Sequence, residues 1–245
     1  NGILELLKLK PKYEYIEGVS NPLYKKYNGF EKISYSQLNS FKDYKEQYIQ
    51  GYFLGNSSES GMFAFFGNLV GTYFSDGEKN ENLSVSDMEA IDKLVKHTSS
   101  KYESEIVIDL EPFGLKDCVL QGFSDHEYDS EGLRYIEDLK TGASKSMFEK
   151  YGDVKKYYQT RMYAYQRELE GFEIGGCRVN HLDRKGNNLQ IGDKNCLRLT
   201  GQIDYIYTPY KKEDVEDYLI NSVVPVCKEI SEYYKVYQKY FGTNN

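Results

Sequence analysis

The stretch Cys118-Val-Leu-Gln-Gly-Phe-Ser-Asp125 is followed by Leu133-Arg-Tyr-Ile-Glu-Asp-Leu-Lys140, and the segment Tyr128-Asp-Ser-Glu-Gly132 lies between them. The two outer stretches contain short apolar runs of the kind that form strands, and the segment between them has the residues of a hairpin turn. We therefore expect two neighbouring strands. Asp125 ends the first strand and Asp138 nearly ends the second, so their carboxylates are predicted to meet at one edge of a sheet.

Working outward from this hairpin, apolar periodicity predicts helices on both sides of a group of strands. Helices are expected over residues 34–48, 62–74, 84–95, 153–169 and 212–240, with a break at Pro225 and with Ser34 or Ser36, Ser84 and Asp153 as start signals. Further strands are expected over residues 105–111, 177–182 and 197–207. This order predicts an α/β chain in which a central mixed sheet is flanked by helices.

At 245 residues the chain can bury one substantial core, and we expect a single domain. Within it, residues 1–100 are mainly helical, residues 101–210 form the sheet core with one motif helix, and residues 211–245 form a C-terminal helix. The four cysteines are far apart and lack C-x-x-C spacing, which predicts reduced, buried thiols. No apolar run approaches the ~20 residues that span a bilayer, so a cytoplasmic protein without membrane contact is expected.

The acidic pair and its neighbours have the chemistry of a metal site. Two close carboxylates repel each other, and this raises a carboxyl pKa unless a cation offsets the charge. Mg²⁺ prefers such oxygen ligands, and Mn²⁺ can take its place. The Leu139 carbonyl can serve as a further ligand. Lys140 lies two residues after Asp138 and therefore projects from the same face of a strand, where its ammonium could orient an attacking water.

A helix and a basic segment follow these residues. Gln159 and Tyr163 are four residues apart and share one helical face, from which they could brace Lys140 or bind a phosphate. The protein carries a net charge of −7, so nucleic acid could be attracted only by a local basic patch. One such patch runs from Lys140 to Arg161 and includes Lys145; its six basic and two acidic residues give +4.

At these residues the chain resembles the PD-(D/E)xK nuclease superfamily, specifically its RecB-like branch of phage exonucleases and CRISPR-associated nucleases. Gly122-Phe-Ser-Asp125 is similar to the family's Gly-x-x-Asp strand end, Asp138-Leu-Lys140-Thr-Gly142 to its Asp-x-Lys-Thr-Gly, and Gln159 with Tyr163 to its Gln-x-x-x-Tyr helix. The resemblance implies a restriction-endonuclease-like core with an N-terminal helical elaboration. It also implies Mg²⁺- or Mn²⁺-dependent hydrolysis of DNA by an exonuclease that acts in DNA recombination, replication or processing. Such an enzyme could work with protein partners, and a phage-encoded one would act in the host cytoplasm.

Two departures from the family pattern keep a second interpretation open. The stretch Phe66-Gly-Asn-Leu-Val70 resembles the helix that usually carries a metal-ligand histidine, but that position is Gly71 here. Further candidate ligands in the sequence are Asp76, Glu78, Glu59 and Glu105. The iron–sulfur members pair one N-terminal cysteine with three clustered near the C-terminus; residues 41–48 contain no cysteine and no C-terminal trio follows, so no cluster is expected. The alternative is a catalytically inactive member that binds DNA or protein.

Overall fold

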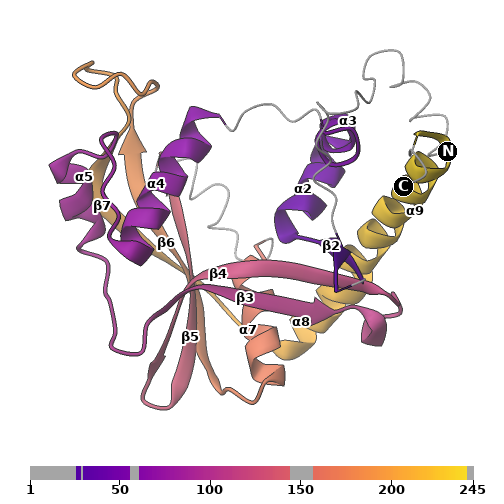
Figure 1. Cartoon of the computed structure of the whole chain (residues 1–245). Helices are drawn as coiled ribbons and strands as arrows, with labels where there is room; N and C mark the ends of the chain where they lie inside the picture. The colour runs from indigo at the N-terminus through magenta and orange to yellow at the C-terminus, as the bar shows by residue number, and fades with distance from the viewer. Residues whose placement is uncertain (1–25, 29, 56–60, 144–156, 242–245) are drawn as a thin grey trace. The chain divides into compact units, whose positions relative to one another are not determined.

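The computed structural model describes residues 26–28, 30–55, 61–143 and 157–241 (Figure 1). The elements of the N-terminal half are β1 (Lys26–Tyr27), β2 (Phe30–Ile33), α2 (Tyr35–Asp43), α3 (Lys45–Tyr48), a π-helical turn (Ile49–Phe53), α4 (Met62–Asp76), α5 (Val85–Ile91), β3 (Lys101–Asp109) and a 3₁₀ turn (Glu111–Phe113). The remaining elements are β4 (Cys118–Ser130), β5 (Leu133–Gly142), α7 (Gln159–Leu169), β6 (Ile174–Lys185), β7 (Arg198–Thr208), α8 (Lys212–Tyr218), a π-helical turn (Leu219–Val223) and α9 (Val224–Phe241).

The strands form a mixed sheet, which together with the helices confirms the predicted α/β class. Hydrogen bonds order the strands β1-β2-β4-β5-β6-β7, and β3 also pairs with β4. The β2–β4 and β5–β6 pairs are parallel, whereas the β1–β2, β4–β5 and β6–β7 pairs are antiparallel.

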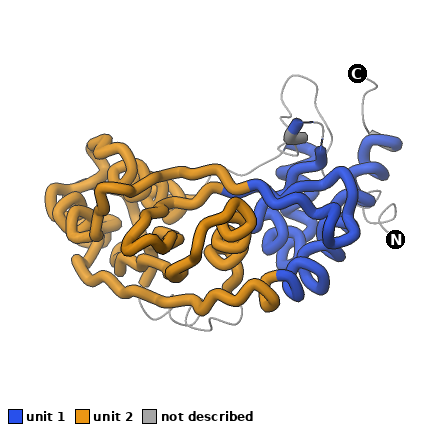
Figure 2. The backbone as a smooth tube through the Cα atoms, turned by 90° about the horizontal axis from the view of Figure 1, so that it is seen from below, with its two compact units in different colours: residues 1–59, 107–122, 216–245 blue, residues 60–106, 123–215 orange. Residues whose placement is uncertain are grey.

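The chain divides into two compact units, which Figure 2 distinguishes by colour. Unit 1 contains residues 1–59, 107–122 and 216–245, and unit 2 contains residues 60–106 and 123–215. Each unit therefore collects segments from distant parts of the sequence. The single domain with three consecutive parts stays a prediction.

Unit 1 has an aromatic core. Phe41 packs edge-on against Tyr48 and Tyr233, with ring centroids 5.2 and 5.6 Å apart, and Phe53 stacks on Tyr237 at 5.7 Å. These rings come from α2, the adjoining helical turns and α9. Burial of large aromatic surfaces at such geometries is a major stabilising contribution.

Unit 2 is built around the β4–β5 hairpin. Its turn has only two residues, Glu131 and Gly132, and both have positive φ (54° and 84°). This backbone matches the tight turns whose twist suits a hairpin. The predicted turn over residues 128–132 was therefore too long, because β4 continues to Ser130 and pairs there with Leu133.

Helices cover both faces of the unit 2 strands. An apolar cluster joins α4 and α5 to β6 and β7, and Leu139 of β5 packs against this cluster. Successive strand residues point to opposite faces, so Asp138 points away from the cluster. On that other face Tyr157, just before α7, donates a hydrogen bond to Asp138. The cluster is formed by Phe66, Val70, Phe74, Leu83, Ala90, Ile91, Leu94, Leu182, Leu197 and Leu199.

The local start and stop signals account for several element boundaries. Ser84 and Asp87 form a reciprocal capping box at the start of α5, and the Ser34 hydroxyl accepts from the Gln37 amide in α2. The predicted C-terminal helix is interrupted by the π-helical turn Leu219–Val223, and Pro225, whose ring cannot supply a backbone donor, is the second residue of α9.

Several predicted boundaries differ from the structure, among them those of β3 and α7. β3 begins at Lys101 and ends at Asp109, which places it earlier than the predicted residues 105–111. The motif helix α7 begins at Gln159, while the proposed cap Asp153 lies outside the described residues. In the described part of the chain, none of the helices combines the length and apolar composition required to cross a membrane.

Candidate functional site

Asp125, Asp138 and Lys140 lie together in unit 2. The β4–β5 register pairs His126 with Glu137, so Asp125 comes beside Asp138 one step along the ladder. The Leu139 amide donates to Asp125 Oδ2 at 2.7 Å, and Lys140 Nζ lies 2.6 Å from Asp138 Oδ2. The hairpin thus brings the predicted acidic pair and the predicted lysine to one place. The prediction that Asp125 and Asp138 lie at strand ends was wrong, because β4 continues to Ser130 and β5 to Gly142.

The surroundings of Asp125 disfavour a second negative charge. Burial raises the pKa of the Asp125 carboxyl to about 7, and the neighbouring Asp138 adds to this effect. Lys140 and the Leu139 amide act in the opposite direction but do not cancel it. The carboxyl of Asp125 is therefore protonated in about half of the molecules at neutral pH, and a cation could replace that proton.

Tyr157 supports Asp138 and was missed by the sequence analysis. Its hydroxyl lies 2.9 Å from Asp138 Oδ2 and 3.1 Å from Gln159 Oε1, so its one proton can serve either oxygen. Gln159 Nε2 in turn donates to the Tyr163 hydroxyl at 3.2 Å, four residues along α7. Burial raises the pKa of Tyr163, with Asp138 contributing, so its phenol stays neutral. The only signal for Tyr157 in the sequence is its position two residues before Gln159.

Arg161 takes a different position from the predicted substrate contact. It is buried, and its guanidinium donates to the Tyr157 carbonyl at 2.7 and 3.0 Å while lying 3.7 Å from the centroid of the Tyr158 ring. Arg161 therefore holds the backbone of the residue that contacts Asp138. Lys145, with most of the predicted basic patch, and Glu59 lie outside the described residues.

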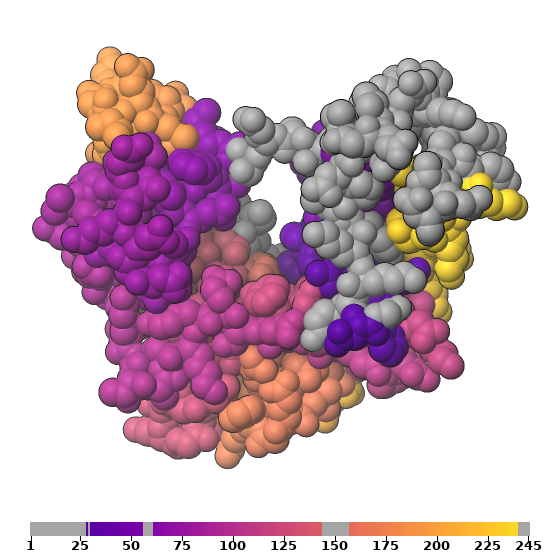
Figure 3. Space-filling model, viewed as in Figure 1, coloured from indigo at the N-terminus to yellow at the C-terminus, as the bar shows by residue number. Residues whose placement is uncertain are grey.

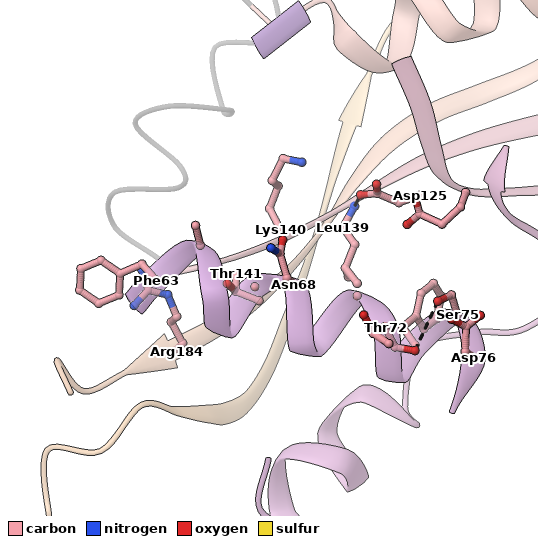
Figure 4. A pocket seen from close by; sticks show the side chains of 15 residues that line it. Phe63, Asn68, Thr72, Ser75, Asp76, Asp125, Leu139, Lys140, Thr141 and Arg184 are labelled. Carbon is pink, nitrogen blue, oxygen red and sulfur yellow. Dashed lines mark hydrogen bonds between the residues drawn. The ribbon is translucent and has the colours of Figure 1, made fainter. Parts of the chain in front are cut away.

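An open pocket of about 840 Å³ lies beside the acidic pair (Figure 4). One wall is a face of α4 from Phe63 to Asp76, and the other comes from strand residues that include Asp125, Leu139 and Lys140. Figure 4 shows Asp125 and Asp76 on one side of the pocket and Phe63 and Arg184 on the other. The site therefore offers acidic groups at one end and an arginine at the opposite end.

Glu103 is a second residue of the site that the sequence did not reveal. It lines the pocket, and its pKa is raised by burial and by the charges of Asp76 and Asp138. Its φ of 48° interrupts β3, so strand alternation could not have located it. The predicted candidate Glu105 is exposed but does not line this pocket, and its carbonyl accepts from Arg167.

The donor set fits a divalent cation in its chemistry. Asp138 is only 1% exposed, and its Oδ1 has no hydrogen-bond partner among the described residues, while Asp125 shares the same charge conflict. An unsatisfied buried carboxylate oxygen is costly, and a hard cation would satisfy it. Within the described ranges, however, no three histidine, cysteine or acidic side chains already converge on one point.

Gly71 and two histidines bear on whether a histidine side chain could serve as a further cation ligand. Gly71 lines the pocket, and a side chain placed there would meet no atom within 4 Å. His126 is held between Glu137 and Ser100, at 2.9 and 2.8 Å, and His181 lies 2.9 Å from the Gly142 carbonyl. Both rings are buried with these partners, so they serve packing and hydrogen bonding.

Comparison with known proteins identifies no family. No protein-family model matches the chain, and no curated protein matches it. Among solved structures, the crystal structure of SSO0001 aligns with a TM-score of 0.42 and 11% sequence identity, over 98% of this chain and 91% of that one.

Proposed function

We propose that this protein is a Mg²⁺- or Mn²⁺-dependent deoxyribonuclease of the RecB-like PD-(D/E)xK type. The observation that carries the proposal is the meeting of Asp125, Asp138 and Lys140 beside one open pocket. These are the residues through which the sequence resembles that superfamily. The exonuclease assignment, the cytoplasmic location and a role in a recombination or replication assembly rest on the resemblance alone.

Each residue has a distinct part in the proposed reaction. Asp125 and Asp138 would hold the cation, with Leu139 contributing its carbonyl and with Asp76 and Glu103 facing the same space. When bound, the cation supplies a more acidic water and offsets charge on the phosphate. Lys140 orients the attacking water, and its contact with Asp138 keeps the ammonium within reach of the phosphate.

Tyr157, Gln159 and Tyr163 position this machinery. The Tyr157 hydroxyl fixes one oxygen of Asp138, and this leaves Oδ1 available to a ligand. The Gln159–Tyr163 pair holds the adjacent turn of α7. Such fixed side chains reduce the reorganisation that the reaction requires.

A cleavage assay tests the proposal. Purified protein is incubated with single- and double-stranded DNA and with Mg²⁺ or Mn²⁺, and Lys140→Ala and Asp138→Ala are compared with the wild type. Lys185→Ala is the matched control, because Lys185 is an exposed lysine on β6 of the same unit. Both site variants should lose at least about 100-fold in rate, the scale on which one electrostatic group acts. Equal cleavage by all four proteins would reject the assignment.

A second function, a catalytically inactive module that binds DNA or protein, is favoured by Gly71. The described residues lack a third ligand already in place, and Gly71 occupies the position where the family resemblance places a histidine. Gly71→His tests it, since a Cβ at this position meets no atom within 4 Å and Gly71 lines the open pocket. An inactive wild type that binds Mn²⁺ only after this substitution, measured by titration calorimetry, would support the module. Cleavage by the wild type would reject it.

A further inference from the structure

Arg184, near the end of β6, reaches the pocket from the side opposite the acidic residues (Figure 4). Its guanidinium carbon lies 4.0 Å from the centroid of the Phe63 ring, near the start of α4. Figure 3 shows the surface around this region, where the purple α4 lies beside the orange connection between β6 and β7. Asn68 and Thr141 line the pocket between its two ends.

Arg184 differs from Arg134, Arg167 and Arg178 of unit 2, each of which has an acidic partner. Arg134 and Arg167 both bind Glu127, at 3.0 and 2.9 Å, whereas Arg178 lies 2.5 Å from Glu137. In the described portion of the chain, no carboxylate pairs with Arg184.

Its neighbourhood makes this lack of a partner costly. The Nε of Arg184 is buried without a hydrogen bond among the described residues. The adjacent Asp183 accepts instead from Thr200. Burial lowers the pKa of Arg184, but a guanidinium keeps its charge at neutral pH. A half-buried cation without an anion costs free energy, and an anionic ligand would remove that cost.

We propose that Arg184, supported by Phe63, binds a backbone phosphate of a nucleic-acid strand, one that flanks the phosphate held at the acidic end of the pocket. This subsite rests on the proposed function, because it assumes that the strand follows the pocket from Asp125 to Arg184. The planar guanidinium can donate two parallel hydrogen bonds to a phosphate. Phe63 is 47% exposed and covers one face of the guanidinium, and because Nε is buried the proposed phosphate contacts are made by the terminal nitrogens.

The chemistry of the subsite predicts how binding depends on salt. Backbone phosphates are bound through charge, and counterions are released when a protein cation neutralises them. Each such contact therefore contributes about 1 to the magnitude of the slope of log K against log salt concentration. Arg184 should therefore act on DNA of any sequence. Lysine at this position would keep the charge but lose the planar fork and the stacking on Phe63.

Fluorescence anisotropy with a labelled single-stranded oligonucleotide tests the subsite in EDTA at several salt concentrations. Arg184→Gln should weaken binding about tenfold and reduce the slope of log K against log salt by about 1. Lys185→Gln is the matched control, since it removes the same charge from the next residue, which is exposed and points to the other face of β6. Its affinity should stay within about twofold of the wild type. Equal losses in the two variants would overturn the proposal.

Two further variants distinguish loss of the phosphate contact from loss of the folded structure. Arg184→Lys should retain the slope and recover only part of the affinity, and Phe63→Leu should weaken binding with the slope unchanged. Circular dichroism melting checks that each variant is folded.

Because the assay needs neither a divalent cation nor cleavage, the two proposals can fail separately. A protein that cuts no DNA but loses affinity on Arg184→Gln keeps the subsite and rejects hydrolysis. A nuclease that binds equally well after Arg184→Gln rejects the subsite alone, and a wild type that binds no DNA in any salt also rejects the subsite.

Discussion

Replacing Asp125 with asparagine should stabilise the cation-free protein at alkaline pH. The structure raises the pKa of this carboxyl to about 7 from an ordinary value of 3.8, through burial and the charge of Asp138. Asparagine has the same shape, and its amide oxygen can still accept from the Leu139 N–H, which lies 2.7 Å from Asp125 Oδ2. The substitution therefore removes the charge conflict while keeping the hydrogen bond.

The sign and size of the effect follow from linkage. A carboxyl whose pKa is higher in the folded state binds its proton more tightly there, so its stabilising contribution is complete below a pH of about 3.8 and is lost as pH rises to about 7. A difference of about three pKa units corresponds to about 4 kcal/mol. Glu103 titrates in the same direction, since its pKa is also raised.

Urea unfolding in EDTA across a pH series measures this contribution. Wild type and Asp125→Asn should have similar free energies of unfolding near pH ~4, and the variant should become more stable by up to about 4 kcal/mol above pH ~7. Asp109→Asn is the control, because Asp109 is exposed and also accepts one backbone N–H, from Glu111 at 2.9 Å. Added Mg²⁺ or Mn²⁺ should stabilise the wild type more than Asp125→Asn. A stability difference that does not grow with pH would refute the reasoning.

Substitutions at Gly175 and Tyr157, with Gly176 as a control, test the packing of unit 2 and the positioning of Asp138. Gly175→Ala should lower the free energy of unfolding by about 1–3 kcal/mol, because its Cβ would lie 2.5 Å from the Tyr135 ring. Gly176→Ala, whose Cβ would lie 3.6 Å from the same ring, should change it by about 0.5 kcal/mol or less. Urea unfolding compares the two variants, and equal losses of stability would contradict the geometry. Tyr157→Phe removes the hydroxyl that reaches Asp138 and should slow DNA cleavage about tenfold in a Mn²⁺ assay, while an unchanged rate would mean that this hydrogen bond does not position the carboxylate.

Much of the fold was predictable because its signals are local. Apolar periodicity located α4, and the capping residues Ser34 and Ser84 marked the starts of α2 and α5. The hairpin turn was placed less well, because Glu131 adopts a positive φ that favours glycine or asparagine, and nothing in its side chain announces this. The division into two units depends on contacts between distant segments, which periodicity does not report.

The site residues, like the fold, were predictable where their positions depend on nearby sequence and unpredictable where they depend on distant segments. Asp125, Asp138 and Lys140 could be grouped from the sequence because a hairpin register and the two-residue strand repeat fix their relative positions. Glu103 and Arg184 could not be grouped with them. Glu103 reaches the pocket through a kink in β3, and Arg184 reaches it from β6 across the width of the pocket.

The pocket concentrates features that each oppose folding. Glu103 holds a left-handed backbone, the pKa of Asp125 is raised to about 7, and Arg184 is a half-buried cation without an anion. Beside the pocket, Asp138 Oδ1 is buried without a hydrogen-bond partner among the described residues. Strain and unsatisfied charge of this kind persist in proteins mainly where a ligand uses them. The acidic end requires positive charge and the Arg184 end requires negative charge, so neither a cation nor an anion alone satisfies both. A divalent cation bound together with a phosphate-bearing strand would satisfy both ends, which is why the proposed catalytic site and the proposed flanking phosphate subsite belong to one surface.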